Sequence, residues 1–176
     1  MKQWARVVIA FFATASWLST TQALEHNFYI SGVLVNEPCT LAVEDGLIEL
    51  DFLSVSDKDL YLNSRTRGNP LVLHLQNCDP TIASHVSIIF SGVESANLPG
   101  LLKLEDGKSR GLAIGLESQQ SNPLLLNKIH HMADLAEGNN EVYFKAFLQA
   151  EPDTLIDRAI GLGSFFGSLT FTLIYE

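Results

Sequence analysis

Positive charge is scarce in this sequence. Its 176 residues hold 11 Lys and Arg against 20 Asp and Glu, a formal net charge of −9. This acidic balance excludes a generally basic nucleic-acid-binding protein. Charged residues as a whole make up only 18% of the chain, whereas apolar residues make up 47%, so the chain is not intrinsically disordered. The length is that of one ordinary domain, with ample apolar material for one core.

Cysteine is equally scarce, since the chain holds only Cys39 and Cys78. Two thiols are too few for an iron–sulfur cluster, which usually needs four, and too few for a structural zinc site built mainly of thiolates. The number suits one disulfide if the chain reaches an oxidising compartment. Two buried free thiols are the alternative.

Motifs of catalysis and metal binding are also missing from the sequence. It contains no G-x-S-x-G nucleophile elbow and no H-E-x-x-H pattern. The adjacent His130 and His131, with Asp134 nearby, are interpreted as part of a solvated loop, because neighbouring residues rarely face one ion. Gly161 and Gly163 precede a predicted strand rather than a helix, so they indicate a turn and not a phosphate-binding loop. We therefore predict no enzymatic activity, no cofactor and no metal site.

Residues 1–23 have the layout of a secretory signal peptide: a positive start without acidic residues, an apolar run over 7–18 and a small, polar end. The expected cleavage follows Ala23, and a second candidate follows Ala15. The apolar run is shorter than the roughly 20 residues of an ordinary membrane span, although an N-terminal anchor or a buried helix remains the alternative. The mature chain, residues 24–176, is expected to be exported, soluble and not inserted into a membrane.

Apolar residues recur with a period of two along most of the mature chain, which is typical of half-buried strands. The clearest runs cover residues 28–35, 71–76, 86–91, 142–149 and 169–175. Shorter candidates cover residues 46–52, 101–104 and 112–116, and only 124–135 has a helical look. Turn residues such as Gly, Pro and Asn separate these runs. The pattern predicts an all-β fold, an antiparallel β-sandwich.

The C-terminal strand, within residues 163–176, is unusually apolar for a chain end. Its odd positions carry the apolar side chains Phe165, Leu169, Phe171, Leu173 and Tyr175. Chain ends usually fray, and an unpaired apolar strand would be an exposed edge prone to aggregation. A place inside its own sheet would explain the alternation but not the extreme position.

An ordered set of segments resembles the type 1 pilin family of chaperone–usher fimbriae and covers nearly the whole mature chain. Residues 28–39 resemble the family's first strand, which ends at the first cysteine, and residues 69–78 resemble the second, which ends in L-x-x-C. Further matches are residues 86–92, residues 111–116, and the late strand 138–146, which opens with G-x-N. The tail has the family's glycine and its penultimate tyrosine, here Gly163 and Tyr175.

The resemblance implies an incomplete immunoglobulin-like β-sandwich that lacks its seventh strand, with one disulfide between Cys39 and Cys78. In such pilins a periplasmic chaperone fills the open groove with a strand of its own. At the outer-membrane usher, the N-terminal arm of the next subunit replaces that strand. The resemblance assigns the groove edge and the chaperone contact to Gly163, Phe165, Leu169, Phe171, Leu173 and Tyr175. It assigns the donor arm to residues 24–30, with Leu24, His26, Phe28 and Ile30.

The implied function is that of a structural, minor subunit of a surface fimbria that contributes to cell adhesion. The implied partners are the chaperone, the usher and neighbouring pilin subunits, and the route leads through the periplasm to the cell surface. Only four residues separate a cut after Ala23 from Phe28, which is short for a donor arm and fits a minor, terminal or regulatory subunit. Cleavage after Ala15 would lengthen the arm. The alternative function is a self-contained secreted β-sandwich that binds a carbohydrate or protein ligand.

Overall fold

The computed structural model describes residues 28–105 and 109–176. The chain divides into two units, Met1–Leu34 and Val35–Glu176. The predicted signal peptide, Leu24 and His26 lie outside the described residues. Among the residues described, no helix has the length and apolar character that a membrane span requires.

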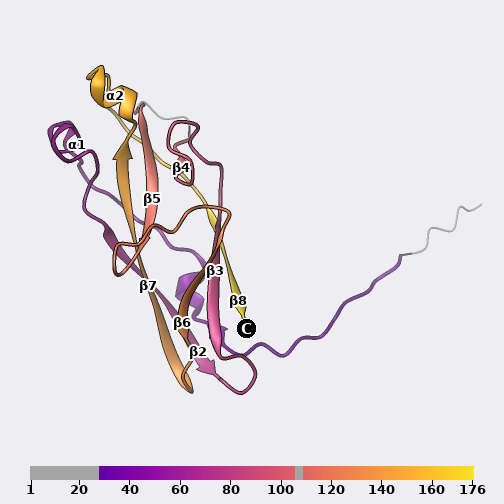
Figure 1. The fold of residues 1–176 in the computed structure, drawn as a ribbon. Coiled ribbons are helices and arrows are strands. Elements are labelled where there is room, and N and C mark those ends of the chain that lie inside the picture. Colours follow the sequence, from indigo (N-terminus) through magenta and orange to yellow (C-terminus); the bar gives the residue numbers. More distant parts are fainter. Residues whose placement is uncertain (1–27, 106–108) are drawn as a thin grey trace, which may run out of the picture. The chain divides into compact units, whose positions relative to one another are not determined.

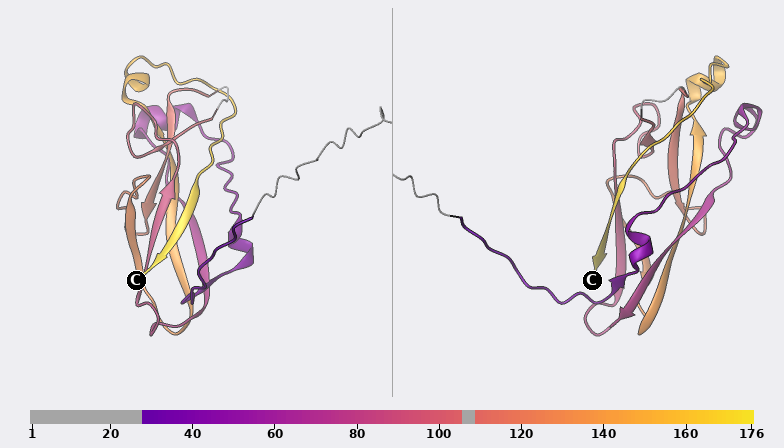
Figure 2. Two further views of the ribbon diagram at one scale, coloured as in Figure 1. Left: turned by 90° about the vertical axis from the view of Figure 1, so that its right-hand side faces the viewer. Right: turned by 180° about the vertical axis from the view of Figure 1, so that it is seen from behind.

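Residues 35–176 form two antiparallel sheets, seen from three sides in Figures 1 and 2. The larger sheet contains, in spatial order, β1 (Thr40–Leu41), β2 (Asn69–Cys78), β7 (Gly138–Ala150), β5 (Leu112–Ser118) and β4 (Leu102–Lys103). The smaller sheet contains β6 (Ile129–Asp134), β3 (His85–Ser91) and β8 (Thr170–Tyr175). Three short helices connect the strands: η2 (Val43–Gly46), α1 (Asp57–Asn63) and α2 (Pro152–Ile156). The predicted all-β, antiparallel architecture is confirmed.

The core lies between the two sheets, because alternate side chains of the central strands turn inward. From the larger sheet, Leu73 and Phe144 are buried, and from the smaller sheet Ile88 and Phe90 are buried against them. The rings of Phe90 and Phe144 meet with their centroids 5.1 Å apart. This contact joins β3 to β7 across the sandwich.

The predicted disulfide between Cys39 and Cys78 is confirmed. Both residues are buried, and they are 39 positions apart in the sequence. On the chain-entropy model, closing a loop of this length stabilises the folded state by about 3–4 kcal/mol. The bond ties the start of β1 to the end of β2.

Most of the predicted strands form where the alternation placed them. Residues 124–135, in which a helix was expected, differ from their prediction. The helical look of that segment is misleading, since its second half forms β6 and pairs with β3. His130 and His131 therefore lie on a strand and not in a solvated loop. Pairing with a neighbouring strand outweighs a weak local preference for helix. The helices α1 and α2 were not predicted; both are shorter than the windows in which helical periodicity can be recognised.

The strand predicted over residues 28–35 is wrong. This stretch has no ladder partner among the residues that the structure describes, and its side chains are exposed, as the fractions of 95% for Phe28, 92% for Ile30 and 100% for Leu34 show. The exposed stretch continues to Glu37. The alternation is real, but a strand forms only when a neighbouring strand supplies hydrogen bonds and an apolar face.

Candidate functional site: an open apolar groove

An apolar groove lies between two extended segments that are far apart in the sequence. One wall is formed by residues 46–52, which follow η2, and the other by residues 167–171, which lead into β8. Figure 2 (left) shows these two segments near each other, residues 46–52 in purple and the chain leading into β8 in yellow. The groove has a volume of about 530 Å³. A hollow of about 340 Å³ adjoins it and shares four of its lining residues, Leu50, Phe52, Ile114 and Gly167.

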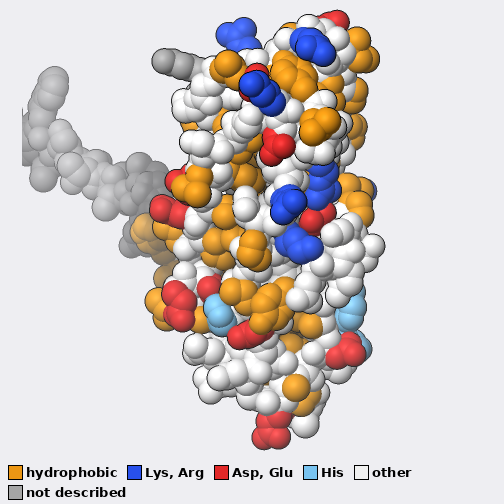
Figure 3. Space-filling model, turned by 90° about the vertical axis from the view of Figure 1, so that its left-hand side faces the viewer, with side chains coloured by type: hydrophobic (Ala, Val, Ile, Leu, Met, Phe, Trp, Pro, Cys, Tyr) orange, Lys and Arg blue, Asp and Glu red, His pale blue; other side chains and the backbone are white. Residues whose placement is uncertain are grey.

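None of the described residues that line the groove has a charged side chain. Its floor comes from strands of both sheets and consists of Leu71, Phe90, Leu102, Ile114, Leu116, Phe144 and Ala146. The opposite side of the molecule, shown in Figure 3, differs, because hydrophobic side chains there are interspersed with Lys, Arg, Asp and Glu. A surface without charge favours an occupant whose own side chains are apolar.

The first wall has the alternation of a strand but no strand partner. Ile48, Leu50 and Phe52 are half-buried and pack against the core, whereas the residues between them are exposed. The strand predicted over residues 46–52 is therefore not formed, although the segment is extended and its apolar side chains face inward. No neighbouring strand is present on the described chain to complete a ladder with it.

A buried carboxylate fixes the point where this wall begins. The backbone N–H of His74 on β2 donates to Asp45 Oδ2 at 2.5 Å, and His74 Nδ1 lies 3.0 Å from the same oxygen. The backbone N–H of Ala42 donates in turn to the His74 carbonyl at 2.9 Å. These contacts hold η2 against β2. Because the first wall begins at the end of η2, they also fix its starting position. Sequence analysis missed this role of Asp45, because no local pattern links residues 29 positions apart.

β8, which continues the second wall, is paired along one edge only. Its neighbour is β3, and no strand in the described part of the chain lies on its other side. Glu176 exchanges both backbone hydrogen bonds with His85, which sets the alternation along the ladder. In an antiparallel pair this alternation turns the backbone groups of every second residue away from the partner. Those residues are Phe171, Leu173 and Tyr175.

The strand predicted over residues 163–176 forms only from Thr170 onward. The residues before it are held by hydrogen bonds to Glu105 instead of by a strand partner. The carbonyl of Phe166 accepts a hydrogen bond from the N–H of Glu105 at 2.9 Å, and the Glu105 carboxylate accepts one from the N–H of Ser168 at 3.1 Å. Gly163 has a φ of 143°, which favours glycine. The chain therefore reaches ladder geometry with β3 only at Thr170.

The six predicted groove residues lie in three places along the C-terminal segment: the groove, the adjoining hollow and the core beside β8. Leu169 and Phe171 line the groove itself. Gly163 and Phe165 line the adjoining hollow, where the ring of Phe165 lies 5.8 Å from that of Phe52. The remaining two, Leu173 and Tyr175, are half-buried against the core further along β8.

Tyr175 also has a perturbed hydroxyl. Burial raises the pKa of the Tyr175 phenol above its ordinary value, and the nearby negative charge of Glu37 raises this pKa further. Both effects favour the neutral phenol over the phenolate.

Most of the first wall and the floor of the groove could not be recognised from the sequence. The alternation over residues 46–52 is a signal of the wall, but it equally predicts an ordinary short strand. The floor residues carry no signal of their own, because core residues and groove residues are equally apolar.

Comparisons with known proteins agree with one another. A family model described as "Fimbrial protein" matches residues 28–176. The chain is 32% identical over 160 residues to the fimbrial-like protein YfcP of Escherichia coli strain K12, covering 89% of this chain and 87% of that protein. It is 29% identical over 165 residues to the fimbrial adapter PapK of Escherichia coli, covering 90% and 93%.

Solved structures show the same fold. A subunit in the structure of a chaperone–usher pilus superimposes with a TM-score of 0.69 at 21% identity, covering 89% of this chain and 99% of that one. The two sheets found here are therefore arranged as in a pilus subunit.

Proposed function

Because the chain belongs to the fimbrial protein family and is a fimbrial subunit, we propose that it is assembled by donor-strand exchange, with the apolar groove as the acceptor. One observation carries the proposal: within residues 28–105 and 109–176, the free edge of β8 borders a groove whose opposite wall is also extended and also lacks a ladder partner. A strand inserted between the walls would pair with β8 and place alternate side chains on the groove floor. Strand addition of this kind combines main-chain hydrogen bonds with side-chain pockets.

The gain from such an insertion is large, because both partners have exposed or half-exposed apolar surface. Each large apolar side chain that becomes fully buried contributes roughly 1.5–3 kcal/mol. The half-buried Leu50, Phe52 and Phe171 of the groove would lose their remaining contact with water. An empty groove, in contrast, is an exposed sheet edge beside an apolar patch, which favours aggregation.

The donor arm of this subunit is proposed to begin near Leu24 and His26 and to include Phe28 and Ile30. Its described part supports a longer arm than residues 24–30, since exposure without strand pairing continues to Glu37. Residues 28–35 alternate as an inserted strand requires. Because an arm of this length is not short, its length does not favour a terminal position in the fimbria. The similarity to the fimbrial adapter PapK supports a minor, adapter-type position.

The proposed route is export behind the signal peptide of residues 1–23, passage through the periplasm on a chaperone, and incorporation at an outer-membrane usher into a surface fimbria. The disulfide between Cys39 and Cys78 supports an oxidising compartment on this route. The proposed role is structural, with neighbouring pilin subunits as its lasting partners and without catalysis.

The experiment that tests this function appends a second copy of the arm, residues 28–37, to the C-terminus of the full chain through a short flexible linker. The linker lets the added segment turn back antiparallel to β8. We expect the melting temperature to rise by roughly 10 °C or more, since each kcal/mol shifts a domain of this size by about 2–4 °C.

The matched control carries the same appended arm with the added copies of Ile30 and Leu34 replaced by Asp. It keeps the length and the linker but cannot fill an apolar groove, so we expect no rise. A soluble chain that is already stable without the arm, and that melts at the same temperature with either arm, would contradict the proposal. That result would favour a complete sandwich that binds a ligand.

A further inference from the structure

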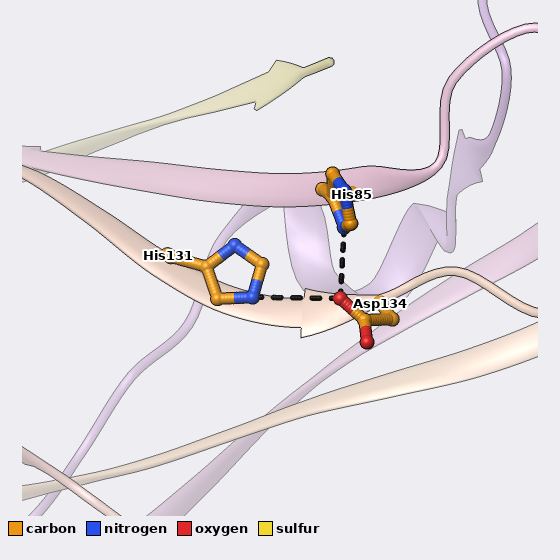
Figure 4. A group of neighbouring side chains, drawn as sticks. All are labelled: His85, His131 and Asp134. Carbon is orange, nitrogen blue, oxygen red and sulfur yellow. Dashed lines mark hydrogen bonds and ion pairs between the residues drawn. The ribbon is translucent and has the colours of Figure 1, made fainter.

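Three side chains of ligand chemistry meet on the smaller sheet, away from the groove. His85 comes from β3, and His131 and Asp134 come from the adjacent β6 (Figure 4). Asp134 Oδ1 lies 2.8 Å from His85 Nδ1 and 3.6 Å from His131 Nε2. One ligand atom from each residue lies within 4.8 Å of the other two.

A β-bulge brings these residues together. Asp134 lies opposite His85 in the ladder, but the register then shifts, so that His131 lies opposite Ser87 and Met132 has no partner. In a regular strand, residues three positions apart point to opposite faces of the sheet. The extra residue turns His131 and Asp134 to the face on which His85 lies. Bulges commonly re-aim side chains beside functional sites.

The ligand set and its dimensions suit a transition-metal ion. Neutral imidazole and carboxylate are both established zinc ligands, and three protein ligands with one open position are typical of sites that keep a water. With bonds of about 2.0–2.1 Å, tetrahedral coordination places ligand atoms about 3.3 Å apart. The observed separations of 2.8 and 3.6 Å lie on either side of that value.

The three side chains are free to make the small rotations that coordination requires. Their exposed fractions are 47% for His85, 60% for His131 and 79% for Asp134. This exposure also leaves a path for the ion and room for a water ligand.

We propose that His85, His131 and Asp134 form a binding site for a divalent transition-metal ion of the zinc class, with water completing the coordination. The bound ion cross-links β3 to β6. The backbone of His85 is itself hydrogen-bonded to Glu176, next to β8, at 2.8 Å. Metal binding therefore braces the sheet whose other edge borders the groove.

The test is isothermal titration of the full chain, carrying a purification tag free of histidine, with Zn²⁺ at pH 7.5. Imidazole binds a metal only in its neutral form, which sets the pH. We expect one Zn²⁺ per chain and at least a tenfold loss of affinity in each of His85→Ala, His131→Ala and Asp134→Asn. The Asp134→His variant keeps a third ligand at the same position and should retain binding.

The matched control is His130→Ala. This imidazole is next to His131 in the sequence, but its Nε2 lies 2.8 Å from the Leu125 carbonyl, and it is not part of the cluster. Its removal should leave Zn²⁺ affinity unchanged. Absence of binding at 1 mM Zn²⁺ would overturn the proposal, as would binding that the three ligand substitutions leave intact.

A second measurement guards against substitutions that disturb folding. Co²⁺ replaces Zn²⁺ in such sites, and the unsubstituted chain with Co²⁺ should show the visible absorption of a tetrahedral ion bound by nitrogen and oxygen. A spectrum identical to that of aqueous Co²⁺ would contradict the site without recourse to any variant.

Discussion

β7 and β8 have similar alternating sequences and very different surroundings. β7 runs for 13 residues in the middle of the larger sheet, paired with β2 on one side and with β5 on the other. Its inward side chains are almost fully buried, with exposed fractions of 2% for Val142 and 4% for Phe144. β8 runs for 6 residues at the edge of the smaller sheet, and none of its side chains is fully buried.

The difference shows that burial depends on what surrounds a strand and not on its own composition. Phe171 is as apolar as Phe144, yet it is only half-buried because the space beside β8 holds no strand.

The largest effect is expected at the closed strand. Phe144→Ala should lower the free energy of unfolding by about 3–5 kcal/mol, because it leaves a cavity against Phe90 in a core that cannot collapse around it. Denaturant unfolding of the chain without the appended arm measures this loss. A loss below about 1 kcal/mol would mean that the two sheets are not packed on each other through this residue.

A smaller effect is expected where the first wall is anchored. Asp45→Ala removes the acceptor of the His74 N–H and should cost about 1–3 kcal/mol. The appended arm should also raise the melting temperature less in this variant, since the wall is no longer held to β2. The matched control is Glu49→Ala, an exposed carboxylate on the same wall, which should change stability by less than about 0.5 kcal/mol. Equal effects of the two substitutions would contradict the anchoring role.

At the open strand, the cost of a substitution should depend on the groove. Phe171→Ala should cost about 1–2 kcal/mol in the chain without the arm, because the ring is only half-buried there. With the appended arm, the same substitution should cost at least about 1 kcal/mol more, since the ring then becomes part of a closed core. Unfolding of the four combinations of substitution and arm measures this coupling. A coupling of zero would place Phe171 outside the region that the arm fills.

The smallest effect is a dependence on alkaline pH. The raised pKa of Tyr175 means that the folded state favours the protonated phenol more than the unfolded state does. The resulting stability is fully present below the ordinary tyrosine pKa of about 10 and is lost as the pH rises through the higher pKa of the folded state. Tyr175→Phe should therefore lose less stability above pH 10 than the unsubstituted chain does. Identical alkaline slopes for the two chains would contradict the burial of this hydroxyl.

The features that the sequence predicted are those that depend on local pattern. The alternation in residues 142–149 and 169–175 was sufficient to place β7 and β8, and the order of motifs around Cys39 and Cys78 was sufficient to identify the family. The strand over residues 28–35 was wrong for the same reason, since alternation reports that a segment is suited to pairing but not whether a partner is present.

The remaining features depend on register and on distant contacts. The cluster of His85, His131 and Asp134 exists because of one extra residue in β6, and no alternation reveals a bulge before the partner strand is known. The contact between Asp45 and His74 joins segments that only the fold brings together. Both features required the structure.

Amide hydrogen exchange along β8 tests the central claim most directly, because it reports each edge of the strand separately. Without the appended arm, we predict slow exchange at Thr172 and Ile174, whose N–H groups point toward β3. We predict fast exchange at Phe171 and Leu173, whose N–H groups point toward the free edge of β8. With the arm, all four amides should be protected. Protection of Phe171 and Leu173 without the arm, or no change on adding it, would contradict an open acceptor groove.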